Sequence, residues 1–461
     1  MVSLSQVELP DFGDEARLPT VSTAEYERRL DMTVERMEAH GLQFLLVYAD
    51  REHSANMSYL TGFDLRFEES VLLLDTKGNR LLLVGNECLG YAPDPALKCQ
   101  VELFQEFSLL GQPRGDSAPL RRIVSDFGLG KGAAVGCVGW KYFAGQNVDH
   151  PAHAMEIPSY IVDLVRDLVQ DRRRVTNAAH LFMDPDTGLR IVNSVDQIAR
   201  FEYAAIKTST SILSAVDHIV EGVAEKDLER HFFGGGLPRS CHPMISFGEK
   251  VRRGLSSPSD NVAQVGDAYV MAFGVEGALN CRAGVVARGP EDLFDEISDF
   301  YPQLAVNYFQ VVVRWYESIK VGAVAGDVFA AVDAQRRREL FSFAVNPGHY
   351  IHLDEWVHSP FVEGSSTVLQ SGAALQMDII PVSQGPFCYI NAEDGVVLAD
   401  EALRDGIASR YPDCWKRIAA RQRFMREGLG IAIDDSVLPL NNTPAWLPPY
   451  ALSPNRLLVN F

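Results

Sequence analysis

The sequence predicts an α+β protein of two domains, at residues 1–190 and 191–461. A chain of 461 residues is longer than one hydrophobic core usually supports, which favours two domains. The first half alternates helical and strand patterns, whereas the second half has longer helical stretches between strands. The polar stretch DPDTGLRIVN, residues 184–193, separates the two patterns and is the predicted linker.

The N-terminal domain is expected to be an α/β layer around a mixed sheet. TAEYERRLDMTVERMEAHG, residues 23–41, has apolar side chains at helical spacing and ends in a glycine, so it predicts a helix. Three short apolar runs, at residues 43–49, 70–75 and 80–86, predict strands, and the turn TKGN joins the last two.

The C-terminal domain begins with a long predicted helix. Ser194 and Gln197 form the two halves of a capping box, and the amphipathic pattern continues to Gly222. The remaining elements are a strand pair within 268–290, helices within 291–342, strands at 373–382 and 395–400, and a basic amphipathic helix at 415–431. The tail, residues 438–461, is rich in proline and aromatic residues, and we expect an arm that runs along a surface.

Composition excludes several classes of function. A net charge of −19 disfavours a nucleic-acid partner. No apolar run approaches the roughly 18 residues of a membrane span, and the first residues lack the pattern of a signal peptide. The seven cysteines have no CxxC spacing, which favours reduced thiols over disulfides or a zinc cluster. We therefore expect a cytoplasmic protein that acts on a small molecule.

Three of the eleven histidines lie close together in NPGHYIHLDEWVHSPF, residues 346–361. They are His349, His352 and His358. An imidazole both accepts and donates protons near neutral pH, since its ordinary pKa is about 6.5, and a neighbouring carboxylate can fix its tautomer. The cluster therefore indicates acid–base chemistry.

Five motifs carry a resemblance to a known family. They are NMSYLTGF followed by SVLLLD, VEGVAEKDLERHF, NPGHYIHLDEWVHSP, QMDIIP and NAEDGVVLAD. Their order over roughly residues 25–400 resembles that of the creatinase, prolidase and aminopeptidase P family. The resemblance implies a pita-bread catalytic domain with a C-terminal arm at 191–461 and a smaller creatinase-type N-terminal domain at 1–190.

The metallopeptidases of this family bind two divalent ions through two aspartates, one histidine and two glutamates. By match of motif, His349 stands at the histidine position, Asp378 at the first glutamate and Glu393 at the second. Alanines, Ala272 and Ala283, stand where the two aspartates belong. Removing two anionic ligands leaves too little charge for a dinuclear site, so we expect neither a metal nor another cofactor.

Creatinase is the metal-free precedent in the family, and it hydrolyses a C–N bond of a small guanidino compound. The resemblance therefore implies acid–base catalysis of C–N hydrolysis, or of a lyase reaction, on a small polar metabolite. The expected catalytic residues are His349, His358, Asp378 and Glu393. His358 resembles the second family histidine, although two extra residues separate it from His349.

The substrate-binding residues are expected at three places. The stretch that carries the creatinase proton shuttle has no histidine here and instead contains Arg252 and Arg253, which suit an anionic group of the substrate. The shuttle is then one of the three clustered histidines, and His352 is a further candidate contact. In creatinase-like members the neighbouring subunit reaches into the cavity, which implies a homodimer with Arg66 and Phe67 in that role.

Two other functions remain open at this stage. One is a metal-dependent Xaa-Pro peptidase or prolidase with altered ligands. The other is a non-catalytic pita-bread module that binds a peptide or protein.

Overall fold

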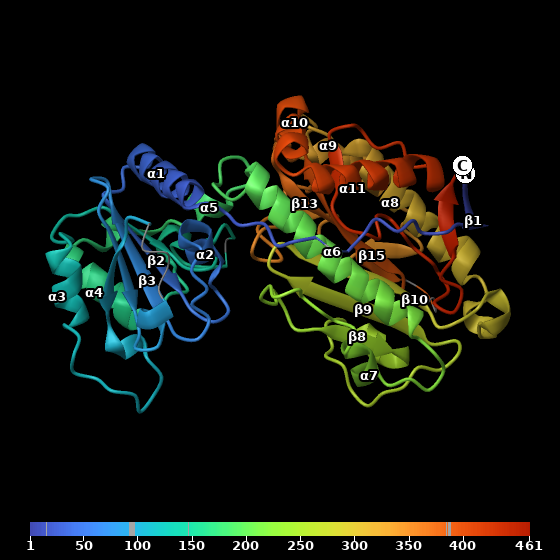
Figure 1. The fold of residues 1–461 in the computed structure, drawn as a ribbon, viewed down its shortest axis with the longest axis horizontal. Helices are drawn as coiled ribbons and strands as arrows, with labels where there is room; N and C mark the ends of the chain where they lie inside the picture. The colour runs from blue at the N-terminus through green and yellow to red at the C-terminus, as the bar shows by residue number, and fades with distance from the viewer. Residues whose placement is uncertain (15, 92–96, 146, 384, 386–388) are drawn as a thin grey trace. The chain divides into compact units, whose positions relative to one another are not determined.

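The structure is a computed structural model, and it describes residues 1–461 except 15, 92–96, 146, 384 and 386–388. The chain divides into two compact units (Figure 1). The N-terminal unit is Val21–Ile191, and the C-terminal unit combines Met1–Thr20 with Val192–Phe461. No helix among the described residues has the length and apolar character needed to cross a membrane.

The N-terminal unit is a mixed sheet flanked by helices (Figure 1). Its main elements are α1 (Thr23–Ala39), β2 (Phe44–Ala49), α2 (Ala55–Thr61), β3 (Ser70–Asp75), β4 (Arg80–Val84), β5 (Gln100–Leu103), α3 (Leu120–Asp126), β6 (Val135–Val138), α4 (Ser159–Val169), β7 (Val175–Asn177) and α5 (His180–Met183). The strand order is β5-β4-β3-β2-β6-β7, with β2 antiparallel to β3 and parallel to β6. The helix and the three strands expected at the start of this unit are all present.

The C-terminal unit is built on a larger sheet. Its helices are α6 (Val195–Asp217), α7 (Glu225–Glu229), α8 (Val306–Ser318), α9 (Ala325–Gln335), α10 (Glu401–Arg410) and α11 (Pro412–Arg423). Its strands are β1 (Val2–Gln6), β8 (Met244–Phe247), β9 (Ala268–Val275), β10 (Ala278–Val285), β11 (Phe341–Phe343), β12 (His349–Tyr350), β13 (Ala374–Asp378), β14 (Pro381–Ser383), β15 (Asn391–Leu398), β16 (Val437–Pro439) and β17 (Arg456–Asn460). The main sheet has the order β12-β13-β15-β10-β9-β8, and β16 pairs with β15.

Helix α6 starts at the expected cap, where the Ser194 side chain accepts a hydrogen bond from the Gln197 backbone N–H. It runs along β9 and β10 in Figure 1 and is almost completely buried. Its Glu202 carboxylate is held by Arg417 at 2.7 and 2.8 Å and by Arg421 at 2.8 Å, both from α11. This pairing satisfies a buried charge that would otherwise oppose folding.

Three expectations need correction. The first 20 residues were assigned to the N-terminal domain, but β1 pairs with β17, so they pack in the C-terminal unit. The strand expected at 373–382 is divided: β13 joins the main sheet, whereas β14 turns away and pairs with β11. The tail was expected on a surface, but Trp446 and Tyr450 are fully buried because the tail completes the core of this unit.

Candidate functional site

One row of side chains crosses the main sheet and defines the site. In the strand register Asp378 lies opposite Glu393, Glu393 opposite Cys281, Cys281 opposite Ala272, and Ala272 opposite Met244. Directly paired residues project from the same face of a sheet, so all five side chains share one face. Strand pairing therefore brings the two predicted carboxylates together although 15 positions separate them in the chain.

His349 lies at the edge of this row, on β12. Its register partner is Gln376, two residues before Asp378 and therefore on the same face. The ring nitrogen Nδ1 is 3.1 Å from the carbonyl oxygen of Tyr350, which can only accept, so Nδ1 carries the proton in that hydrogen bond. The other nitrogen, Nε2, is 3.2 Å from Glu355 Oε1 and 3.8 Å from Asp378 Oδ2.

Asp378 and Glu393 form a coupled pair of buried carboxyls, hydrogen-bonded to each other and exposed by 4% and 7%. Burial raises the pKa of Asp378 well above its ordinary value, and the charges of Glu393 and Glu355 raise it further. Burial and the charge of Glu355 also raise the pKa of Glu393, to about 7, against the lowering effect of His349. The pair thus retains a proton at neutral pH, as required of a general acid.

Three polar atoms on this face of the sheet are buried without a hydrogen-bond partner within the described part of the chain. They are His349 Nε2, Asp378 Oδ1 and Gln376 Oε1. An unsatisfied buried polar atom costs about 1–3 kcal/mol, so such atoms are retained where function needs them. Nε2 offers a base and the carboxyl offers an acid, and a water or substrate atom bonded to them would satisfy both.

A hydrogen-bonded side chain fixes Glu393 from the same strand. Asn391 Nδ2 donates to Glu393 Oε1 at 3.1 Å and contacts Cys281 Sγ at 3.5 Å. The Tyr308 hydroxyl on α8 in turn lies 3.0 Å from Asn391 Oδ1. Burial raises the pKa of Cys281 well above its ordinary value, so this thiol stays neutral.

The structure places the other two clustered histidines differently. His352 is fully buried and packs edge-on against Phe201 of α6, with ring centroids 5.2 Å apart. His358 is partly buried, and its backbone pairs with Tyr350. Their contacts with substrate stay predictions.

The residues of this face do not fit the dinuclear metal centre that the resemblance implies for metallopeptidases. Ala272 and Ala283, at the two aspartate positions, lie in a buried apolar cluster together with Met244, Val270 and Leu279. Among the described residues no group of three or more histidine, cysteine, aspartate or glutamate side chains is arranged to hold a metal ion. Two of the five ligand positions therefore contribute no donor atom to a metal.

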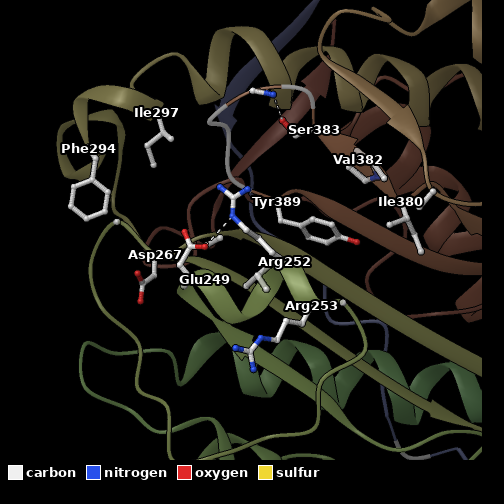
Figure 2. A pocket seen from close by; sticks show the side chains of 18 residues that line it. Glu249, Arg252, Arg253, Asp267, Phe294, Ile297, Ile380, Val382, Ser383 and Tyr389 are labelled. Atoms are coloured by element: carbon white, nitrogen blue, oxygen red, sulfur yellow. Dashed lines mark hydrogen bonds and ion pairs between the residues drawn. The ribbon is translucent and has the colours of Figure 1, made fainter.

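A cavity of about 600 Å³ lies next to the apolar cluster, within the C-terminal unit. Arg252 and Arg253 line it, together with Glu249 and Tyr389. Figure 2 shows the Arg252 side chain beside Glu249 and Tyr389, whereas Arg253 points the other way. Arg252 Nε is 3.2 Å from Glu249, and both side chains are exposed, so an anion can compete for this arginine.

Apolar side chains form most of the rest of this cavity. They include Phe294, Ile297, Ile380 and Val382. Tyr389 lines the cavity and also packs against the apolar cluster that contains Cys281, so it lies between the cavity and the carboxyl pair's face of the sheet. The cavity therefore suits a substrate with an apolar part and an anionic end.

The segment that carries the two arginines is held by Glu225 of α7, whose side chain is fully buried. Its carboxylate accepts hydrogen bonds from Phe247 N at 2.9 Å, Ser259 N at 3.0 Å, Ser259 Oγ at 2.7 Å and Asn261 Nδ2 at 2.9 Å, and it pairs with Lys250. Burial alone would raise its pKa, but the hydrogen bonds bring the pKa below the ordinary value.

Glu225→Gln is expected to increase the mobility of residues 247–261 and to lower the free energy of unfolding by about 1–3 kcal/mol. The reason is that an amide cannot accept all of the hydrogen bonds that the Glu225 carboxylate accepts. Hydrogen exchange of that segment should accelerate. Asp227→Asn, an exposed acid on the same short helix, is the matched control and should leave exchange unchanged. Equal exchange rates in the two variants would contradict this role for Glu225.

Arg66 and Phe67 lie in the N-terminal unit. Arg66 forms an ion pair with Asp64 at 2.8 Å, and Phe67 is 55% exposed. Their role across a dimer stays a prediction.

Sequence reasoning missed Glu355 and Trp356, which both contact His349. They stand in the same histidine-rich stretch, and the two extra residues between His349 and His358 were the available signal. Asn391 was also missed, although strand alternation from Glu393 places it on the same face. Cys388, one of the cysteines expected to be reduced, lies outside the described residues, and the other six are free thiols.

Comparisons with known proteins agree with this architecture. Residues 29–119 match the family model described as Creatinase/Prolidase N-terminal domain. No curated protein sequence matches the chain.

Solved structures with a similar fold cover most of the chain. Recombinant prolidase from Thermococcus sibiricus is 17% identical, with a TM-score of 0.63 over 83% of this chain and 96% of that one. Xaa-Pro dipeptidase from Bacillus anthracis is 15% identical, with a TM-score of 0.61 over 82% and 96%. A variant of Escherichia coli aminopeptidase P is 17% identical, with a TM-score of 0.55 over 87% and 99%. The resemblance noted in the sequence is therefore confirmed: the chain carries a creatinase/prolidase N-terminal domain followed by the pita-bread fold of prolidases, Xaa-Pro dipeptidases and aminopeptidase P.

Proposed function

We propose that this protein is a metal-independent, creatinase-like hydrolase that cleaves a C–N bond in a small polar metabolite. One observation carries the proposal. His349 Nε2 is buried without a hydrogen-bond partner and lies 3.8 Å from Asp378, whose Oδ1 also has none. On the same face of the sheet, alanines stand at the two positions where metal-binding aspartates were expected.

The geometry supports a closed proton cycle. Nε2 of His349 takes a proton from a water molecule, whose oxygen forms a bond to the substrate carbon. The Asp378–Glu393 pair gives its proton to the departing nitrogen as the C–N bond breaks. The imidazolium, 3.8 Å from Asp378 Oδ2, then returns one proton to the carboxyl pair and restores the starting state.

Turnover in this scheme requires a protonated carboxyl. Burial and neighbouring charge raise the pKa of Glu393 to about 7 and that of Asp378 well above its ordinary value. The acid is therefore present at neutral pH and is lost as the pH rises above the pKa values of the pair. A lyase reaction uses the same two groups without the water.

A metal-dependent Xaa-Pro dipeptidase is the second candidate. The observation that favours it is the convergence of His349, Asp378 and Glu393, which stand at three family ligand positions and lie together on one face. Similar folds solved as prolidases and Xaa-Pro dipeptidases add to this candidate.

Metal analysis and a chelation assay separate the two candidates. We expect less than about 0.1 equivalent of manganese, iron, cobalt or zinc per chain, because two ligand positions are alanine. Turnover of guanidino and other C–N compounds should survive EDTA. Two equivalents of metal, or Xaa-Pro cleavage that EDTA abolishes and manganese restores, would establish the peptidase instead.

We also propose that the protein acts as a homodimer in which Arg66 and Phe67 of one subunit complete the cavity of the other. A cytoplasmic location accompanies this proposal, since the described cysteines are free thiols. Light scattering combined with Arg66→Ala kinetics tests the dimer. A monomer with full activity would contradict it.

A further inference from the structure

The stretch between His349 and His358 folds as a short hairpin whose loop contacts His349. Tyr350 N donates to His358 O at 2.7 Å, and Val357 N donates to Tyr350 O at 3.0 Å. Residues 351–356 form the tip of this hairpin. Glu355 and Trp356 both lie in this tip.

The tip places two side chains on the ring of His349. The Trp356 indole stacks on the imidazole, with centroids 4.0 Å apart and planes inclined by 19°. Glu355 Oε1 lies 3.2 Å from Nε2. Tyr350 O engages Nδ1, Trp356 covers one face of the ring, and Glu355 is the nearer of the two carboxyl groups beside Nε2.

We propose that Glu355 and Trp356 are positioning residues of this site: Glu355 directs His349 Nε2, and Trp356 fixes the plane of the ring. The inference rests on the hydrolase proposed above. It assigns a function to the tip of this hairpin, which places a carboxylate and an aromatic face against the ring of His349.

Exposure distinguishes Glu355 from the other groups of the cluster. The side chain of Glu355 is 28% exposed, whereas those of His349 and Asp378 are 0% and 5% exposed. Of these three groups, Glu355 is therefore the one that solvent reaches most directly. The stacked indole of Trp356 limits rotation of the His349 ring about its own axis.

The electrostatics of the carboxyl pair agree with this placement. The charge of Glu355 contributes to the raised pKa of both Asp378 and Glu393, after burial. A neutral residue at position 355 should therefore lower both pKa values and shift the alkaline limb of the activity profile toward lower pH. A residue that only supports the hairpin would not change this limb.

Glu355→Gln tests the proposal in two ways. On a compound turned over by the parent protein, kcat should fall by about 100-fold with KM nearly unchanged, and the alkaline limb should move down by about one pH unit. Glu355→Asp retains the charge and should recover part of kcat. Glu363→Gln, an exposed acid further along the same loop, is the matched control and should behave as the parent.

The second readout needs no substrate. The emission of Trp356, obtained by subtracting the spectrum of Trp356→Phe, reports on its stacking against His349. At neutral pH its intensity should change in Glu355→Gln, because the ring loses the group that directs Nε2, and remain unchanged in Glu363→Gln. Unchanged emission in Glu355→Gln overturns the proposal. Changed emission in a protein that turns over no C–N compound supports the assignment of Glu355 and overturns the proposed hydrolase.

Discussion

Asp378→Asn is expected to abolish turnover and yet to stabilise the protein at pH 8. Turnover should fall by about 100- to 10,000-fold, because the carboxyl pair loses the proton that the departing nitrogen requires. An asparagine amide can still donate a hydrogen bond to Glu393, so the packing of the site is retained. Initial rates and thermal unfolding of the same samples measure both effects.

The stabilising effect follows from the direction of the pKa shifts. Both carboxyls have folded-state pKa values above their ordinary values of 3.8 and 4.5, and that of Glu393 is about 7. In the window above about pH 4 the folded protein therefore binds more protons than the unfolded chain, and stability decreases as the pH rises. The shift of Glu393 alone corresponds to about 3 kcal/mol lost by pH 8.

The pH dependence provides the control for this prediction. At about pH 4, where both carboxyls are protonated in the parent protein, Asp378→Asn should gain little or no stability. At pH 8 its unfolding temperature should exceed that of the parent. A variant that is less stable than the parent at both pH values would show that Asp378 is ionised in the folded state, and the proposed acid would then be wrong.

Local sequence patterns predicted the helices and strands that are determined by interactions between residues close together in the chain. The three apolar runs became β2, β3 and β4, and the Ser194 cap starts α6, because alternation, burial and capping act over a few residues. The resemblance identified His349, Asp378 and Glu393, which strand register then brings together.

The contacts of Glu355 and the burial of the tail were not predicted, because both depend on pairing between segments that are distant in the sequence. Glu355 reaches His349 only because Tyr350 and His358 pair, and no periodicity marks a hairpin tip. Trp446 and Tyr450 stand among prolines, a composition typical of an exposed arm, yet they are buried because this part of the tail lies against β10, where Val285 pairs with Tyr450 and Arg282 binds Trp446 O. In both cases a long-range contact overrides the local signal.

Arg282→Met is expected to cause the largest loss of stability, about 3–5 kcal/mol. Arg282 and Asp394 alternate with Cys281 and Glu393 along their strands, so they project from the opposite face of the sheet. There Arg282 Nη2 lies 2.7 Å from Asp394 Oδ1, and neither side chain is exposed. Methionine would leave the Asp394 charge buried without its partner.

The same arginine also holds the C-terminal tail. Arg282 Nε donates to Trp446 O at 2.6 Å, and Nη2 donates to Thr443 O. Urea unfolding of Arg282→Met should therefore show a lower midpoint, and limited proteolysis should cleave near residues 440–450 first. Lys416→Met, which removes an exposed pair with Asp413 at 3.1 Å, should change the free energy of unfolding by less than about 1 kcal/mol.

A double replacement determines whether the unpaired charge of Asp394 explains the loss of stability in Arg282→Met. If the cost of Arg282→Met comes from a stranded carboxylate, then adding Asp394→Leu should recover part of the stability, since an apolar pair can replace a buried ion pair. If the cost comes from the freed carbonyls of the tail, the double variant should be no more stable than the single one. In both variants Glu393 remains on the opposite face of the sheet, so activity per folded molecule should be retained. A loss of this activity would contradict the assignment of Arg282 and Asp394 to stability and of the opposite face to catalysis.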